Sequence, residues 1–460
     1  MIEKKLADMI SSTRFKELPG DTVVTTRQSI LDITGVTIAG SGRPEIDLLR
    51  NTLTHYYRSG RCPVLGTPFL LSGLGAALFN GAASRVLDFD DVVDPLGTHP
   101  SVAVFASLLS VAYEMDALPS DADFLTAFAV GHDVCTRLAR ARKYTLLETG
   151  RYDLSKIIGS AAAAANLLQL GFDQTLNALG IAYTSCLGEA QCMVEGAPTV
   201  SYQQGLVALN AVSAVGLAAA GYKGANNFLT GRYGLFNAFE PGADVSLVIK
   251  DLGSDFAGNS SIAYKPFPTC RPNISAALLA IELMDGTYRS TDDISSISIR
   301  VNQQIFDLVC APAATKWRPQ SPVEARFGMA YTVAAALIDG KVSINVYDED
   351  RLSDAKILSL SELVRPAADC SCDIPELGTH GRICVEIDFK DGGHVRGSVD
   401  RAKGNPDYPM TASELEEKFK DCMEYRYGNR EKGAEVIAAA GNMEKSTSAS
   451  YLTALIGLSS

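Results

Sequence analysis

The hydrophobic periodicity of this chain changes after Lys265, and that change limits the folds it can adopt. Before this point, long segments such as Thr26–Gly40 carry apolar residues at helical spacing. After it, Ile294–Val301 and Ile383–Phe389 alternate apolar and polar residues with period two. An Asp-Gly-Gly turn and a further alternating segment, His394–Val399, follow the second of these. This pattern predicts a β-hairpin in the later part of a chain that begins as a helical protein.

A chain of 460 residues is too long for one ordinary hydrophobic core, so more than one domain is expected. We predict a mostly α protein: a large all-α helical domain, residues 1–265 plus 405–460, with an inserted smaller α+β lid domain, residues 266–404. An insertion joined by two chain crossings is suited to moving over a cleft. The expected helices are Thr26–Gly40, Leu74–Leu87, Val102–Met115, Ala122–Arg142, Lys156–Leu170, Asp173–Cys186, Gln203–Ala220, Asn226–Leu229, Ala276–Met284, Glu324–Ile338 and one starting near Thr411.

The stretch Arg85–Ala106 combines acidic residues with a helix start. Four acids lie in an otherwise apolar segment, and a His-Pro-Ser sequence then opens a long apolar run. Pro100 suits the first turn of a helix, which places His99 at or beside the cap. Helix N-termini favour anions and a neutral imidazole, so His99 is a candidate acid or base. The alternative is an ordinary loop in which the acids cap helices and His99 is solvated. The four acids are Asp88, Asp90, Asp91 and Asp94.

A second candidate stretch, Tyr264–Pro272, reads YKPFPTCRP. Pro266 forces Lys265 away from helical geometry, and three prolines stiffen this crossing between the two predicted domains. Lys265 could be desolvated and act as a base, or stay charged and hold a carboxylate. Arg271 offers a bidentate contact to a carboxylate. The alternative is that both side chains lie in an exposed crossing.

Composition and motifs exclude several function classes. A net charge of −12 argues against nucleic acid or an anionic membrane surface as a partner. Nucleotide-binding glycine loops and a G-x-S-x-G sequence are absent, and the five histidines contain no i, i+4 pair, so no metal site is predicted. His132 is expected in the core and His394 in solvent. Ten scattered cysteines, no signal peptide and no membrane span predict a cytoplasmic protein.

Five motifs, in order along the chain, resemble the MmgE/PrpD family. They are SRVLDFDD followed by HPSVAV, GHDVCTRLARA, YKPFPTCRP, PVEARFGMAYTVAAALIDGKV and NPDYPMTASELEEKF. The resemblance spans nearly the whole chain. It implies a helical domain with a smaller α+β lid, a homodimer, and a cofactor-independent site between the domains. The family's activities include 2-methylcitrate dehydration, cis-aconitate decarboxylation and iminodisuccinate epimerisation, all of which move a proton beside a carboxylate.

Matched residue by residue, Asp88, His99 and Lys265 correspond to active-site positions of the family and are the predicted catalytic residues. Basic residues of the family are replaced at several positions, which are Asp153, Val200, Gln203 and the Asn273-Ile274 pair. Losing two basic groups weakens tricarboxylate binding, because each charge-assisted hydrogen bond is worth roughly 1.5–3 kcal/mol. Asp153 could instead pair with an amino or imino group. The predicted substrate contacts are Asp91, Asp153, Gln203, Cys270 and Arg271.

The resulting hypothesis is a cofactor-independent lyase, of dehydratase or decarboxylase type, that moves a proton α to a carboxylate of a small di- or tricarboxylate. Lys265 and His99 are the acid and base, Asp88 orients or binds, and Arg271 holds carboxylate. An epimerase acting on an iminodisuccinate-like compound by two-base proton transfer is the first alternative. A non-catalytic carboxylate-binding relative is the second, and a metal hydrolase is a remote third.

Overall fold

The computed structural model describes residues 1–57, 60–94, 96–374 and 381–459. Within these residues the chain forms two units, which we call the helical unit and the α+β unit. The helical unit contains residues 1–86, 90–263 and 411–460, and the α+β unit contains residues 87–89 and 264–410. The boundaries predicted above, 1–265 plus 405–460 and 266–404, stay a proposal about independently folding domains.

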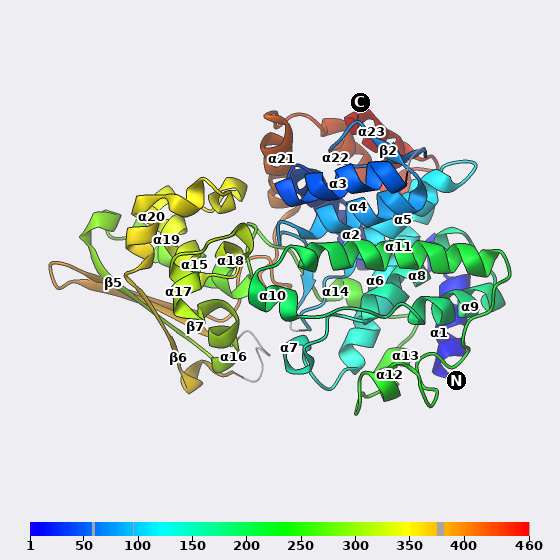
Figure 1. Cartoon of the computed structure of the whole chain (residues 1–460), viewed down its shortest axis with the longest axis horizontal. Coiled ribbons are helices and arrows are strands. Elements are labelled where there is room, and N and C mark those ends of the chain that lie inside the picture. The colour runs from blue at the N-terminus through cyan, green and yellow to red at the C-terminus, as the bar shows by residue number, and fades with distance from the viewer. Residues whose placement is uncertain (58–59, 95, 375–380, 460) are drawn as a thin grey trace. The chain divides into compact units, whose positions relative to one another are not determined.

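The helical unit is built mainly from helices (Figure 1). Two short antiparallel strand pairs interrupt it: β1 (Cys62–Pro63) with β2 (Leu70–Leu71), and β3 (Val92–Val93) with β4 (Ile262–Ala263). Its helices are α1 (Ile2–Ser12), α2 (Gly20–Gly40), α3 (Pro44–Tyr56), α4 (Gly73–Arg85), α5 (Pro100–Glu114), α6 (Asp121–Ala141), α7 (Leu146–Thr149), α8 (Ser155–Leu167), α9 (Phe172–Tyr183), α10 (Gln191–Glu195), α11 (Thr199–Ala219), α12 (Leu235–Ala238), α13 (Ser246–Ile249), α14 (Ala257–Ser260), α21 (Ala412–Tyr427), α22 (Ala434–Ala440) and α23 (Ser450–Ser459).

Small residues allow the central helices of the helical unit to pack closely. Helix α4 packs on α11 and α5, and α8 packs on α6 and α5. A Cβ atom on Gly205 of α11 would lie 2.2 Å from the carbonyl oxygen of Leu78 on α4. Gly159 of α8 is also confined, because a Cβ there would lie 2.2 Å from Sγ of Cys135 and 2.8 Å from the carbonyl oxygen of Gly131, both on α6. These contacts explain why the sequence of this unit is rich in Gly and Ala at helical positions.

The α+β unit contains one four-stranded mixed sheet in the order β6-β5-β7-β8. Strands β5 (Ile294–Val301) and β6 (Val364–Ala368) are parallel, whereas β7 (Ile383–Phe389) is antiparallel to β5 and to β8 (His394–Val399). Alternate residues of β7 are buried, as their period-two pattern requires. The helices of this unit are α15 (Arg271–Asp285), α16 (Gln303–Ile305), α17 (Ala313–Trp317), α18 (Pro322–Arg326), α19 (Met329–Asp339) and α20 (Ala355–Ser361).

Helices α15 and α19 pack against each other, and α15 also contacts β7 and β8 (Figure 1). The core of this unit is formed by apolar residues of α15, α19 and the three strands β5, β6 and β7. The predicted fold class, mostly helical with a smaller α+β part, is therefore confirmed.

Two predicted helices are wrong in detail. Asn226–Leu229 forms turns rather than a helix. The predicted helix Glu324–Ile338 is divided into α18 and α19, because the chain leaves helical geometry at Phe327 and Gly328. Gly328 also lies close to Lys316, where an added Cβ would be 3.1 Å from the carbonyl oxygen.

Candidate functional site

His99 is the N-cap residue of α5, and Pro100 occupies the first turn, as the sequence predicted. The Nδ1 atom of its imidazole lies 2.8 Å from Oδ2 of Asp90, whose side chain is fully buried. The other oxygen of Asp90, Oδ1, accepts a hydrogen bond of 2.9 Å from Nη1 of Arg85, at the end of α4. Asp90 is thus fixed by a cation on one side and aligned with an imidazole on the other.

This arrangement suits acid–base chemistry. A carboxylate beside Nδ1 fixes the ring orientation and favours the tautomer that carries its proton on Nδ1. The Nε2 atom then has a lone pair that can accept a proton, and Asp90 stabilises the imidazolium that results. The side chain of His99 is 13% exposed, whereas Asp90 has no exposed surface. His99 is therefore the member of the pair with exposed surface, and Asp90 is its buried, fixed partner.

Asp91 belongs to a separate buried group. Its Oδ2 accepts a hydrogen bond from Oγ of Ser101, and that Oγ lies 2.8 Å from Nε2 of His132 on α6. Burial raises the pKa of Asp91 well above its usual value, and burial lowers the pKa of His132 to about 3. His132 is consequently neutral near pH 7, and burial favours the protonated form of Asp91. Asp91, a predicted substrate contact, therefore belongs to a buried hydrogen-bond network that holds the start of α5.

Asp153 lies just before α8 and is also buried. It accepts hydrogen bonds from Oγ1 of Thr98 and from Oγ of Ser155 at 2.6 Å, and forms an ion pair with Arg142 at 3.3 Å. Burial opposes its ionisation, but the Arg142 and Lys156 cations and the hydroxyl donors outweigh burial and lower the pKa of Asp153. Both oxygens are engaged within the protein. This argues against our interpretation that Asp153 binds an amino or imino group of a ligand.

The structure adds a buried lysine that sequence reasoning missed. The Nζ atom of Lys156 on α8 donates a 3.0 Å hydrogen bond to Oε1 of Gln204 on α11, and lies 4.4 Å from the ring centroid of Tyr152. The hydroxyl of Tyr152 in turn accepts a 3.3 Å hydrogen bond from Nε of Arg85. A chain of contacts therefore runs from His99 through Asp90, Arg85 and Tyr152 to Lys156. The available signal was that Lys156 is the only charged residue of α8.

Gln203, another predicted substrate contact, lies next to Gln204 but outside this chain of contacts. Its amide forms hydrogen bonds with the backbone of Glu189: Oε1 accepts from the N–H at 2.8 Å, and Nε2 donates to the carbonyl at 3.1 Å. Nε2 also lies 3.2 Å from Sγ of Cys192. Its contacts hold the segment before α10, and a role in substrate binding stays a prediction.

In the α+β unit, Lys265 and Asp88 form a buried pair. Nζ of Lys265 lies 3.0 Å from Oδ1 of Asp88 and donates a 2.8 Å hydrogen bond to the Asp88 carbonyl oxygen. Asp88 adopts a left-handed backbone conformation with φ +51°, which is uncommon for a non-glycine residue. Such conformations persist where the surroundings enforce them and concentrate at functional sites. Only Phe89 separates Asp88 from Asp90, the partner of His99, in the sequence.

Cys270 and Arg271 lie at the start of α15 in the same unit. Cys270 is the N-cap residue, and Nη1 of Arg271 donates a 3.2 Å hydrogen bond to the carbonyl oxygen of Lys403. Tyr347 was not predicted from the sequence: burial raises its pKa to about 12, and the negative charge of Asp88 acts in the same direction. A neutral phenol therefore lies near the Lys265–Asp88 pair. The substrate-binding roles of Cys270 and Arg271 stay predictions.

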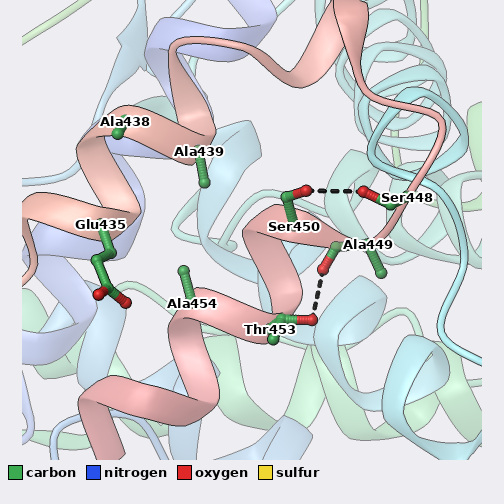
Figure 2. A pocket seen from close by; sticks show the side chains of 8 residues that line it. All are labelled: Glu435, Ala438, Ala439, Ser448, Ala449, Ser450, Thr453 and Ala454. Atoms are coloured by element: carbon green, nitrogen blue, oxygen red, sulfur yellow. Dashed lines mark hydrogen bonds between the residues drawn. The ribbon is translucent and has the colours of Figure 1, made fainter.

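Other kinds of site find little support in the part of the chain that the structure describes. No group of three or more His, Cys, Asp or Glu side chains there could hold a metal ion. No described helix combines the length and apolarity that crossing a membrane requires. A pocket of about 530 Å³ lies between α22 and α23, and Figure 2 shows the side chains that line it. Its described lining is mainly Ala, Ser and Thr with one carboxylate, Glu435, and offers no cation for an anionic ligand.

Models of two domains match the chain: the MmgE/PrpD N-terminal domain over residues 4–248 and the MmgE/PrpD C-terminal domain over residues 267–442. The first alone covers more than half of the chain, so this protein belongs to the MmgE/PrpD family. The family predicted from the five sequence motifs is therefore confirmed.

Several relatives match most of the chain at modest identity. A cis-aconitate decarboxylase-like protein of Aspergillus oryzae is 24% identical over 447 residues, covering 91% of this chain and 90% of that protein. The cis-aconitate decarboxylase of Mus musculus is 25% identical over 435 residues, covering 91% and 86%. The 2-methylcitrate dehydratase of Salmonella typhimurium is 25% identical over 352 residues, covering 72% and 70%.

Proposed function

We propose that this protein is a cofactor-independent lyase, of dehydratase or decarboxylase type, that acts beside a carboxylate of a small di- or tricarboxylate. The observation that carries this proposal is the alignment of His99 with the buried Asp90, 2.8 Å from its Nδ1 atom. Membership of the MmgE/PrpD family supports it, because the relatives named above are a decarboxylase and a dehydratase. The homodimer and the cytoplasmic location stay predictions.

Each candidate residue has a separate role in the proposed reaction. His99, through Nε2, moves the proton, and Asp90 stabilises its charged form. The ammonium group of Lys265 is oriented by Asp88 and stabilises the negative charge that develops on an enediolate-like intermediate. Arg271 remains a candidate for holding a carboxylate, once its side chain leaves the Lys403 carbonyl.

Both lyase reactions are compatible with these groups. In dehydration, a base removes the proton next to the carboxylate, a carbon–carbon double bond forms, and the hydroxyl of the neighbouring carbon is protonated and leaves as water. In decarboxylation, a carbon–carbon bond breaks, carbon dioxide leaves, and an acid protonates the carbon that keeps the electron pair. Each reaction needs one group that exchanges a proton and one cation that stabilises an anion.

Two alternatives lead to different outcomes in one assay. An epimerase would move a proton between the two faces of one carbon, with Lys265 and His99 as the two bases. A non-catalytic relative would bind carboxylates without turnover, and the replacement of basic residues by Val200 and Gln203 favours it.

The experiment is incubation of the purified protein with cis-aconitate, 2-methylcitrate and iminodisuccinate, followed by proton NMR. A product lacking carbon dioxide or water supports the proposal, and an inverted centre with an unchanged formula supports the epimerase. His99→Asn should lower kcat at least about 100-fold, since general acid–base catalysis contributes roughly 10²–10⁴-fold. Lys265→Met should lower kcat by a similar factor, because removing one group that stabilises a developing negative charge costs about 10²–10³-fold. Turnover within threefold of wild type in either variant would remove that residue from the mechanism. The exposed His394→Asn serves as the matched control for the histidine.

A further inference from the structure

Lys156 is a buried cation that the proposed acid–base chemistry does not use. Only 1% of its surface is exposed, on a helix whose other described side chains are apolar or uncharged. A buried ammonium is costly unless hydrogen bonds or an opposite charge compensate it. The contacts of its Nζ atom are one hydrogen bond to Oε1 of Gln204 and the face of the Tyr152 ring.

These contacts leave donors unused. An ammonium group has three N–H donors, and among the described residues Lys156 has one hydrogen-bond acceptor. Gln204 is fully buried, and its Nε2 atom has no hydrogen-bond partner within the described part of the chain. Two neighbouring side chains, one on α8 and one on α11, therefore both present unused donors.

The nearby acid does not neutralise Lys156 by direct contact. Asp153 is close enough for the Lys156 cation to lower its pKa, but its oxygens are engaged by Arg142, Ser155 and Thr98. No ion pair of Lys156 occurs in the described residues 1–57, 60–94, 96–374 and 381–459. The group as a whole therefore lacks an acceptor that carries negative charge.

We propose that Lys156 and Gln204 bind a carboxylate of the substrate, with the ammonium and the amide N–H groups donating to its oxygens. Charge-assisted hydrogen bonds of this kind are the strong ones in proteins. The contacts from Lys156 through Tyr152, Arg85 and Asp90 to His99 connect this carboxylate site to the proposed proton carrier within the helical unit. The inference rests on the proposed function, since it assigns a residue set to a second carboxylate of that substrate.

Gln204→Glu tests this site with little change in shape. The new carboxylate would accept the Lys156 hydrogen bond and neutralise its charge, so the core of α8 and α11 is preserved. The measurement is calorimetric titration with succinate and with its monoamide, succinamate, for wild type, Gln204→Glu and Lys156→Met. Asn51→Asp, on the exposed side of α3, makes the same change of net charge elsewhere in the helical unit.

Wild type and Asn51→Asp should both bind succinate at least tenfold more tightly than succinamate. Gln204→Glu and Lys156→Met should reduce this ratio to near one. A purely structural role would weaken both ligands together and leave the ratio unchanged, which would overturn the inference. Failure of the wild type to bind succinate would also overturn it.

The inference and the proposed function can fail separately. Selective succinate binding that depends on Gln204, without turnover of any tested acid, would retain the carboxylate site and remove the lyase. If the protein turns over one of the acids and Gln204→Glu leaves its preference for succinate unchanged, the lyase is retained and the carboxylate site at Lys156 and Gln204 is removed.

Discussion

Breaking the ion pair between Lys265 and Asp88 should strongly destabilise the α+β unit. Its two side chains are only 2% and 7% exposed, and Lys265 Nζ contacts both the carboxylate and the carbonyl oxygen of Asp88. Breaking a buried pair by removing one partner costs about 3–5 kcal/mol, because the remaining charge loses its compensation. We therefore expect Lys265→Met to lower the free energy of unfolding by about 3–5 kcal/mol.

The partner substitution must respect the backbone of Asp88. Because its φ is +51°, Asn is the appropriate replacement, since Asn tolerates the left-handed region better than other non-glycine residues. Asp88→Asn removes the charge and keeps an oxygen acceptor. In the double variant the decrease in the free energy of unfolding should be smaller than the sum of the two single decreases, with a coupling energy of at least about 1 kcal/mol.

The assay is urea denaturation at pH 7, followed by circular dichroism, for wild type, both single variants and the double variant. Lys341→Met makes the same side-chain change at an exposed position of the α+β unit and should alter stability by less than about 0.5 kcal/mol. Additive losses, or a loss for Lys265→Met below about 1 kcal/mol, would refute the reasoning.

Three further predictions follow from the helical unit. With a pKa of about 3 in the folded protein and 6.5 when unfolded, His132 binds a proton in the unfolded chain first, so acid favours unfolding. Between pH 7 and pH 4.5, the wild type should lose about 2.5 kcal/mol more unfolding free energy than His132→Asn in urea titrations; equal losses would contradict this. Gly205→Ala should cost at least about 2 kcal/mol, because its Cβ would lie 2.2 Å from the Leu78 carbonyl oxygen. Gly216→Ala, in open space on the same helix, should be neutral or stabilising, and thermal melts that rank the two variants the other way would exclude this steric account. Thr411→Ala should lower the free energy of unfolding by about 1 kcal/mol in urea titrations, because Thr411 and Glu414 form a capping box at the start of α21; an unchanged midpoint would show that the box contributes nothing.

Local signals in the sequence predicted the elements that depend on neighbouring residues. Pro100 marks the start of α5 and thereby places His99 at its cap. The turn between β7 and β8 is equally local, so both strands of the hairpin were predicted with their observed bounds. Strand β6 was missed, because it is parallel to a strand more than 60 residues earlier and contains Pro366, which is typical of an edge strand.

The site residues were predicted less completely, because their roles depend on contacts between distant segments. The sequence could single out Lys265 and Asp88, but their pairing spans 177 residues. It could not separate adjacent acids: Asp90 aligns His99, whereas Asp91 lies beside Ser101 with its pKa raised by burial. Lys156 was overlooked because helical periodicity predicts burial of its helix and does not show which buried residue carries an unused donor.

The central claim is that this protein moves a proton at a carbon next to a carboxylate. Its most direct test is proton NMR in D₂O of the wild type with a panel of di- and tricarboxylates, alongside His99→Asn. The account predicts deuterium at that carbon of the substrate or its product in the wild type, and at least about 100-fold slower incorporation in the variant. Absence of deuterium from every acid in the panel, with a folded protein that binds succinate, would contradict it and favour a carboxylate-binding protein without catalysis.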